Sequence, residues 1–321
     1  MAKIVMALGG NALGDTPQKQ LRQIKNAAHT IADLICAGHE VIVCHGNGPQ
    51  VGMISLGLSA AAEQGVIKAT VPLPECGAMS QGYIGYHLQN AITNELASRN
   101  MRKAAITVIT QVVVDERDPA FQNPTKPVGP FFTKEKAQEL ERETHCTMME
   151  DSGRGYRWVV PCPAPVDIVE KQVIQELLSG GNIVVAAGGG GIPVIKRDWE
   201  LIGVPAVVDK DFAAEKLAEL VCADCLVMLT AVDKVSIHFG RPNERPLSTI
   251  TVEEAQRYCA EGEFGVGSML PKVQAAIAFA KKGKETIITS LRNAAAALDG
   301  EDVCTRIRSC RSAACDQLHV G

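Results

Sequence analysis

The stretch KIVMALGGNALG (residues 3–14) joins an apolar run to a glycine-rich loop, and a helical pattern follows it from about Gln18 to Ala37. The run KIVMAL has the length and composition of a buried β-strand. This order of strand and helix repeats along the chain. Strand-like runs recur at residues 40–45, 103–110, 182–189, 225–232 and 285–289, and helical patterns recur at about 78–99, 213–222 and 270–282. The alternation predicts an α/β protein with a largely parallel sheet and helices on both of its faces.

The composition argues against several classes of protein. Of the 321 residues, 46% are hydrophobic and 21% are charged, which is ordinary for a soluble globular protein. The net charge of −4 gives no positive field for nucleic acid or an anionic membrane, and no run of apolar residues is long enough to span a bilayer. Eleven cysteines, scattered along the chain, fit reduced thiols better than a disulfide framework. We therefore expect a cytoplasmic protein that binds neither nucleic acid nor membrane.

The cysteine spacing does not predict a metal site. One C-x-x-C pair occurs, Cys222 and Cys225, but no second pair follows at the spacing of a structural zinc site. We expect Cys222 to close a helix and Cys225 to open an apolar strand, with both buried. The C-terminal residues Cys304, Cys310 and Cys315 also match no structural zinc spacing. No metal-ligating residue is predicted.

The alternation is interrupted between about residues 112 and 165, where seven prolines and a charged helical piece occur. We interpret this segment as a small, lid-like subdomain inserted between sheet strands. It carries Lys126 in the stretch NPTKP, where Pro124 and Pro127 stiffen the backbone on both sides. Taken alone, Lys126 is more simply explained as an exposed lysine on a rigid surface loop.

Three glycine-rich clusters each follow a strand-like run, at residues 7–14, 44–52 and 186–194. Loops that follow the strands of an α/β sheet meet at its carboxyl edge, where ligands bind. Their backbone N–H groups can hold an anion beside helix N-termini, although any single cluster is as well explained as a tight turn. None completes a dinucleotide fingerprint, and Asp15 stands where a Walker A loop needs its lysine. The positive charge for a bound phosphate must therefore come from elsewhere.

Lysines in two other contexts could supply that charge. Lys210 lies between Asp209 and Asp211 directly before a predicted helix, and Asp211 could cap this helix and hold neighbouring ammonium groups. Lys272 falls in the first turn of another helix, where its charge opposes the dipole unless an anion shares the space. A solvated lysine remains the alternative for both. The chain has no nucleophile–base motif, and phosphoryl transfer to an already anionic acceptor does not need one.

Six stretches of the sequence closely resemble the carbamate kinase family of the amino acid kinase superfamily. They are VMALGGNALG, HGNGPQVG, NPTKPVGPFF, EDSGRGYR, VVDKDFAAEKLAELV and GSMLPK, and the resemblance extends over about residues 3–290. It implies a three-layer α/β/α sandwich around a mostly parallel, about eight-stranded open sheet with a small protruding subdomain. It also implies a homodimer, with a carbamate lobe at residues 1–220 that includes the subdomain and a nucleotide lobe at residues 221–321.

The resemblance implies reversible phosphoryl transfer between ATP and carbamate, giving ADP and carbamoyl phosphate, with Mg²⁺ accompanying the nucleotide. The family often makes ATP from carbamoyl phosphate formed in arginine, agmatine or purine breakdown. The implied catalytic residues are Lys126, Lys210, Asp211 and Lys272, with Asp211 orienting its two neighbouring lysines. The residues implied in substrate binding are Gly9, Gly10, Asn11, Gly46, Asn47, Gly48, Gly189 and Gly190. Those implied in nucleotide binding are Lys210, Asp211, Ala231, Asp233, Phe239, Met269, Leu270 and Lys272.

Two parts of the chain depart from the family's pattern. On the adenine side stand Lys234, where family members carry an aromatic or another residue, and the pair His238–Phe239, where an Asn-Tyr type pair is expected. The tail at residues 304–321 matches nothing. Two rival functions remain: another carboxylate kinase of the superfamily, such as an acetylglutamate-type enzyme, and a catalytically silent ligand sensor. Acetylglutamate-type enzymes lack a subdomain with the NPTKP stretch. A silent sensor does not need to retain the four catalytic residues, which this chain has.

Overall fold

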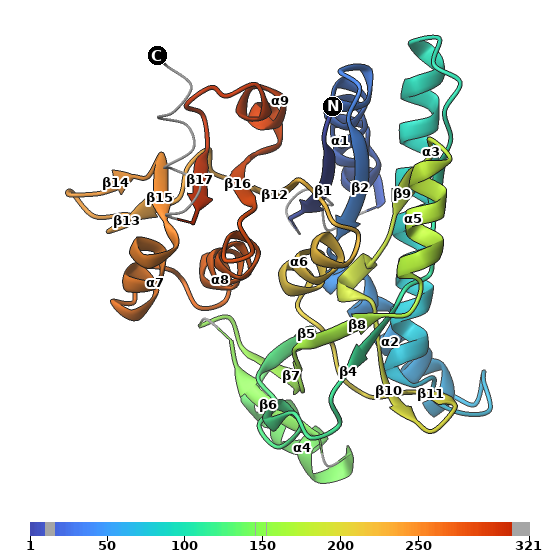
Figure 1. The fold of residues 1–321 in the computed structure, drawn as a ribbon. Coiled ribbons are helices and arrows are strands. Elements are labelled where there is room, and N and C mark those ends of the chain that lie inside the picture. Colours follow the sequence, from blue (N-terminus) through green and yellow to red (C-terminus); the bar gives the residue numbers. More distant parts are fainter. Residues whose placement is uncertain (10–16, 145, 152, 310–321) are drawn as a thin grey trace, which may run out of the picture.

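A large open sheet dominates the computed structural model, which describes residues 1–9, 17–144, 146–151 and 153–309 (Figure 1). Within these residues the sheet has eight strands in the order β15-β17-β16-β12-β1-β2-β9-β3. Their bounds are β1 Lys3–Leu8, β2 Glu40–His45, β3 Ala105–Thr107, β9 Ile183–Val185, β12 Cys225–Thr230, β15 Thr249–Thr251, β16 Glu285–Ser290 and β17 Thr305–Arg308. Neighbouring strands run parallel except β16 and β17. The predicted mostly parallel sheet is confirmed.

Helices cover both faces of this sheet because its strands alternate their apolar side chains between two cores. In β1, Ile4, Met6 and Leu8 face one core, and Val5 and Ala7 face the other. The first core contains residues of α1 (Pro17–Cys36), α3 (Leu73–Ser98) and α9 (Ala294–Leu298). The second contains residues of α5 (Lys171–Ser179), α6 (Lys210–Leu220), α7 (Val252–Ala260) and α8 (Met269–Ala280). The result is the three-layer α/β/α sandwich that the sequence predicts.

The segment predicted as an insert, residues 112–165, divides between two structures. Its ends belong to a second sheet with the order β11-β10-β4-β8, formed by β4 (Gln111–Val114), β8 (Pro165–Ile168), β10 (Ile192–Arg197) and β11 (Glu200–Gly203). Its middle forms a protruding subdomain of three antiparallel strands and a helix, which are β5 (Lys126–Phe132), α4 (Lys134–Thr144), β6 (Thr147–Glu150) and β7 (Tyr156–Val160) (Figure 1). The protruding unit is therefore shorter than the predicted segment.

The subdomain rests on α2 (Gly48–Glu63) through a close backbone contact. A Cβ on Gly52 would lie 2.8 Å from the Cα of Gly129 in β5, so only a hydrogen fits there. Val51, Val128 and Val160 pack in a small apolar core that α2, β5 and β7 share. This contact fixes the height at which β5, and Lys126 at its first position, stands above α2.

Gly52→Ala should destabilise the protein by about 1–3 kcal/mol, because the added methyl group forces β5 away from α2. Gly57 on the same helix offers a matched control, since nothing lies within 4 Å of a Cβ at that position. Gly57→Ala should stabilise the protein by about 0.5–1 kcal/mol through its better helix propensity. Urea unfolding followed by far-UV circular dichroism measures both changes. Equal free energies of unfolding in the two variants would show that β5 can move away from α2 without loss of stability.

Residues 236–309 contain elements that the sequence did not predict. Thr305–Arg308, from the unassigned tail, is β17, which pairs with both β15 and β16. Both of its arginines pair with Glu285 of β16: Arg306 Nη1 donates to Glu285 Oε2 at 2.9 Å, and Arg308 also pairs with this carboxylate. A short two-stranded sheet, β13 (Ser236–Ile237) and β14 (Arg245–Pro246), precedes β15. The rest of the tail, from residue 310, lies outside the described residues.

The cysteines follow the prediction in part. Cys225 is buried at the start of β12, as expected, but Cys222 is exposed, with φ at 53°, just after α6 has ended. Cys222 thus takes the left-handed conformation that commonly ends a helix. The nine cysteines of the described residues are free thiols. No described helix combines the length and hydrophobicity that crossing a membrane requires.

Candidate active site

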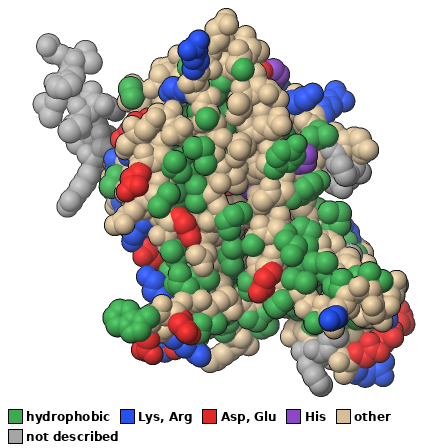
Figure 2. Space-filling model, turned by 90° about the vertical axis from the view of Figure 1, so that its right-hand side faces the viewer, with side chains coloured by type: hydrophobic (Ala, Val, Ile, Leu, Met, Phe, Trp, Pro, Cys, Tyr) green, Lys and Arg blue, Asp and Glu red, His purple; other side chains and the backbone are tan. Residues whose placement is uncertain are grey.

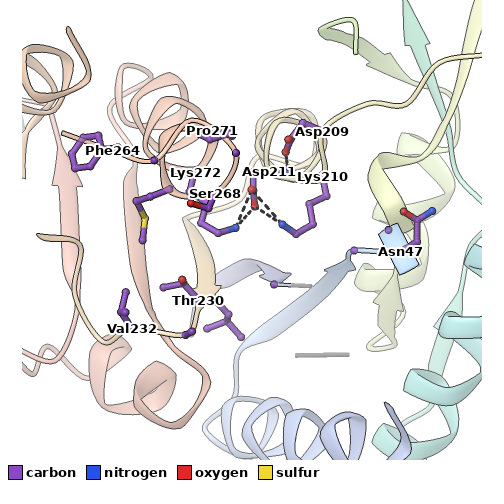
Figure 3. Close-up of a pocket in the computed structure, with 18 of the residues that line it drawn as sticks. Asn47, Asp209, Lys210, Asp211, Thr230, Val232, Phe264, Ser268, Pro271 and Lys272 are labelled. Atoms are coloured by element: carbon purple, nitrogen blue, oxygen red, sulfur yellow. Dashed lines mark hydrogen bonds and ion pairs between the residues drawn. The ribbon is translucent and has the colours of Figure 1, made fainter. Parts of the chain in front are cut away.

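A cavity of about 900 Å³ opens at the carboxyl edge of the main sheet. Residues that end or follow β1, β2, β12 and β16 line it. The N-terminal residues of α2, α6 and α8 line it as well (Figure 3). The first N–H groups of a helix have no partners within the helix and carry the positive end of its dipole. Helix starts converging in this way favour an anionic ligand.

Asp211 lies at the centre of the charged side of the cavity and holds two lysines. Lys272 Nζ donates to both of its carboxylate oxygens at 2.9 Å, and Lys210 Nζ lies 3.3 Å from the same two atoms (Figure 3). Asp211 is 3% exposed and Lys272 is 8% exposed. One buried carboxylate thus compensates only one of two ammonium charges, and the remaining charge suits a phosphate group. Because Lys272 is buried, the alternative of a solvated lysine does not fit its position.

Burial and then the neighbouring charge of Lys210 lower the pKa of Lys272 to about 8, although Asp211 opposes both effects. The start of α8 contributes in the same direction, because the positive end of the helix dipole disfavours an ammonium group. Lys272 therefore occupies a position that is electrostatically unfavourable for a lysine until an anion binds.

Lys126 enters the same cavity from the protruding subdomain. Its Nζ lies 2.5 Å from Oδ2 of Asp209, and its side chain is 37% exposed. Burial alone would lower the pKa of Lys126, but the charge and hydrogen bond of Asp209 outweigh burial and raise it. The sequence did not predict this partner, because the contact joins residues 83 positions apart. Lys126 is thus anchored to the main body instead of standing free on a surface loop.

The glycine loops reach the cavity unequally. Gly9, Gly46, Gly48 and Gly189 line it, and Gly10 and Asn11 lie outside the described residues. Asn47 also lines it, and its Nδ2 donates to Ser80 Oγ at 2.8 Å, which fixes the amide beside the start of α2.

Gly190 does not line the cavity. Its φ is +94°, and a Cβ at this position would lie 1.9 Å from the carbonyl oxygen of Val208, so glycine is required by packing. The tight-turn interpretation suits this position, whereas Gly189 next to it contributes to the cavity wall.

The predicted nucleotide-side residues also divide. Ala231, Phe239 and Met269 line the cavity. Leu270 instead packs against the core beneath α8, and Asp233 lies at a smaller neighbouring cavity, where its Oδ2 accepts from Arg292 Nη2 at 2.6 Å. Lys234, expected on the adenine side, lines the cavity. The structure adds lining residues that were not predicted: Gln23, Asn26, Asp209, Thr230, Val232, Glu263, Phe264, Ser268 and Pro271.

Some of these additions had a signal in the sequence. Thr230 and Val232 end a strand-like run, and strand ends in an α/β sheet point to ligands. Asp209 precedes a predicted helix as an N-cap residue. Glu263 and Phe264 lie between two helices, in a stretch without periodicity that could have placed them.

Comparisons with known proteins identify the family to which this chain belongs. The model of the amino acid kinase family matches residues 2–290. The chain belongs to the amino acid kinase family. It is 53% identical over 306 residues to a carbamate kinase of Clostridium perfringens, covering 93% of this chain and 98% of the relative. It is 51% identical over 301 residues to the carbamate kinase-like protein YqeA of Escherichia coli, covering 93% and 97%.

Solved structures of this family agree with the fold. Carbamate kinase from Giardia lamblia bound to AMP-PNP superposes with a TM-score of 0.89 at 42% identity, covering 96% of this chain and 98% of that one. An N-acetylglutamate synthase from Neisseria gonorrhoeae, at 15% identity and a TM-score of 0.56, shares the fold alone. The resemblance inferred from the six sequence stretches is confirmed.

The site of this amino acid kinase suits transfer of a charged group better than proton abstraction. Among the described residues that line the cavity there is no histidine or cysteine. His45 lies beneath the site in the core, where burial lowers its pKa to about 4 although its Nδ1 bonds to the Gly46 carbonyl at 2.9 Å. The cavity instead presents four lysines and three carboxylates, with backbone N–H groups at helix starts. Such groups stabilise charge in a transition state.

Proposed function

We propose that this protein is a carbamate kinase, which transfers a phosphoryl group reversibly between ATP and carbamate. One observation carries the proposal: Lys126 of the protruding subdomain and the cluster of Lys210, Asp211 and Lys272 line a single cavity. Relatives about half identical in sequence over nearly the whole chain are carbamate kinases by name. In this proposal the cell uses the enzyme in its cytoplasm to make ATP from the carbamoyl phosphate of arginine, agmatine or purine breakdown.

The reaction needs charge stabilisation and no general base. A carbamate oxygen is already an anionic nucleophile, so no proton has to be removed before it attacks the γ-phosphoryl group. Lys210 and Lys272 neutralise charge that spreads over the transferring group, and Asp211 keeps both in place before the reaction begins. N–H groups of Gly9, Gly46 and Gly48 bind the planar carbamate at the start of α2. Lys126 binds it from β5 of the protruding subdomain.

The nucleotide enters as its Mg²⁺ complex in this proposal. No group of three or more His, Cys, Asp or Glu residues in the described ranges could hold a metal. Asp209 and Asp211, which line the cavity, are both bonded to lysines. Mg²⁺ in kinase sites is often bound chiefly by substrate phosphates and water. The cavity fits an ion carried in by the nucleotide, where it would reduce the negative charge of the phosphates.

The apolar side of the cavity is the proposed place of the adenine ring. Ala231, Phe239 and Met269 lie there, and Phe239 is 67% exposed, so a planar base could cover it. Lys234, which departs from the family's pattern, is held by Ser248 Oγ at 2.7 Å and Asp302 Oδ1 at 2.7 Å. Its charge is thus compensated within the protein, and its stem can pack beside the base.

An assay with purified protein, ADP, Mg²⁺ and carbamoyl phosphate tests the proposal by following ATP formation. A parallel reaction with ATP and N-acetylglutamate tests the acetylglutamate-type alternative. ATP formation in the first assay and no ADP formation in the second is the expected result. ADP binding without ATP formation would overturn the proposal in favour of the ligand sensor.

The pH dependence of this reaction should report Lys272. In the free enzyme its pKa of about 8 means that the charge is lost as pH rises through that value. We therefore expect kcat/KM for ADP to fall above about pH 8, whereas kcat should persist to higher pH because bound phosphate raises the pKa. Steady-state rates from neutral to strongly alkaline pH measure both. Lys272→Arg keeps its charge at all of these pH values, so its kcat/KM should not fall above pH 8. If kcat/KM of this variant falls as in the wild type, the fall belongs to another group.

We also propose that the enzyme is a homodimer through the face in Figure 2. Hydrophobic side chains gather on this face, to which α2 and α3 belong. Met53 and Leu56 on α2 are 58% and 40% exposed, and Met79 and Tyr86 on α3 are 47% and 60% exposed. Met79 and Tyr86 are seven positions apart, so they share one side of the helix.

Light scattering should give the mass of a dimer for the wild type and the mass of a monomer for Tyr86→Lys. A monomeric wild type would overturn the proposed dimer.

A further inference from the structure

Two carboxylates flank Lys210 at the start of α6, and they hold different lysines. Asp211, inside the helix, bonds to Lys210 and Lys272 of the main body. Asp209, the N-cap residue, bonds to Lys126 of the protruding subdomain. The two side chains lie close together in sequence but hold lysines from different parts of the chain. Figure 3 shows Asp209 on α6 apart from the cluster in which Lys210 and Lys272 converge on Asp211.

We propose that Asp209 is a positioning residue, which fixes the ammonium group of Lys126 over the cavity and thereby ties the protruding subdomain to α6. The inference rests on the proposed function for its kinetic consequence. A lysine side chain has four rotatable bonds and loses rotamer entropy when it is fixed. An ion pair formed before substrate arrives removes that cost from the reaction step.

The geometry of Asp209 separates this role from its structural one. Its Oδ1 accepts the N–H of Asp211 at 2.9 Å, which caps α6. Its Oδ2 accepts from Lys126 Nζ at 2.5 Å. The carboxyl group is anchored, because Asp209 is 9% exposed and belongs to the start of a helix packed in the core. Within the pair, Asp209 is therefore the fixed group, and it determines the position of the Lys126 ammonium group.

The pair leaves Lys126 able to bind substrate. An ammonium group has three donors, and Asp209 accepts one of them. Asp211 and Cys162 also face Lys126 from other elements, and both act on it less strongly than Asp209 does. Two donors therefore remain for an anion in the cavity.

The variant Asp209→Asn tests this assignment, because asparagine caps helices as well as aspartate but carries no charge. We expect kcat for ATP formation to fall about 10- to 100-fold, as for a misplaced catalytic group, with KM for ADP changed less than about twofold. In a Lys126→Ala background the same change should have no further effect, because there is no lysine to place. Asp151→Asn is the matched control: Asp151 pairs with Arg157 inside the subdomain and does not line the cavity.

Unchanged kcat in Asp209→Asn, or equal losses from this change with and without Lys126, would overturn the proposal. A second measurement does not depend on the reaction. Hydrogen exchange of the β5 amides, without substrate, should be at least about threefold faster in Asp209→Asn than in the wild type if the pair ties the subdomain down. If the wild type makes no ATP, the proposed function fails while exchange still decides the role of Asp209, and unchanged exchange then overturns it.

Discussion

Replacing Lys272 with alanine should lower kcat for ATP formation about a thousandfold, because the transferring phosphoryl group loses a buried cation that was already in place. The buried position of Lys272 makes its charge effective, since little water screens it. Asp211 would keep Lys210 as its partner. A coupled assay of ATP formation at saturating ADP and carbamoyl phosphate measures the change.

The same substitution should leave the fold intact. Lys272 has a lowered pKa, so its charged form is disfavoured in the folded protein, and its removal relieves that strain. Lys281, the exposed C-cap residue at the other end of α8, provides the matched control. Lys281→Ala should retain wild-type kcat. A loss of less than about tenfold in Lys272→Ala would show that Lys272 does not contact the transferring group.

Lys126→Ala should lower kcat about a hundredfold or more while ADP affinity stays within about twofold of the wild type. Lys126 reaches the cavity from β5, whereas the apolar side proposed for adenine is formed by residues of other elements. The substitution therefore removes a charge from the carbamate end and leaves the nucleotide contacts in place. Steady-state kinetics and calorimetric titration with ADP separate the two effects.

Lys136→Ala is the control for this second substitution. Lys136 belongs to α4 of the same subdomain, is half-exposed and pairs with Glu139 three residues away. Its removal should change neither kcat nor ADP affinity, since exposed pairs contribute little. Equal losses of turnover and ADP affinity in Lys126→Ala would place Lys126 on the nucleotide side or make its role structural.

The inner strands of the main sheet could be predicted from the sequence because they are buried on both faces. A strand such as β1 or β12 then appears as an unbroken apolar run. Strand β17 could not be predicted in this way. It alternates buried Thr305 and Ile307 with two arginines, and both arginines pair with Glu285 on the neighbouring strand, which compensates one of their two charges. That compensation depends on the register between β16 and β17, which the sequence of β17 does not contain.

The candidate site could be predicted where its residues belong to local motifs. Asp211 and Lys210 are adjacent, and Lys272 follows a helix-start pattern, so each was visible within one short stretch. Asp209 as the partner of Lys126 was not, because the pair depends on how β5 lies across α2 and α6. Gly190 shows a different limit of the sequence, since a glycine-rich loop contains positions required by packing as well as positions that line the cavity.

The place of β17 in the sheet also bears on the order in which the chain assembles. Strand β15 at residues 249–251 pairs with β17 and with no other described strand of the main sheet. During synthesis from the N-terminus, β15 therefore exposes an unpaired edge until residues 305–308 have been made. Unpaired strand edges are templates for association with other chains. The side of the sheet proposed to hold the nucleotide is thus the last to close, and until then a nascent chain can associate with other chains through β15.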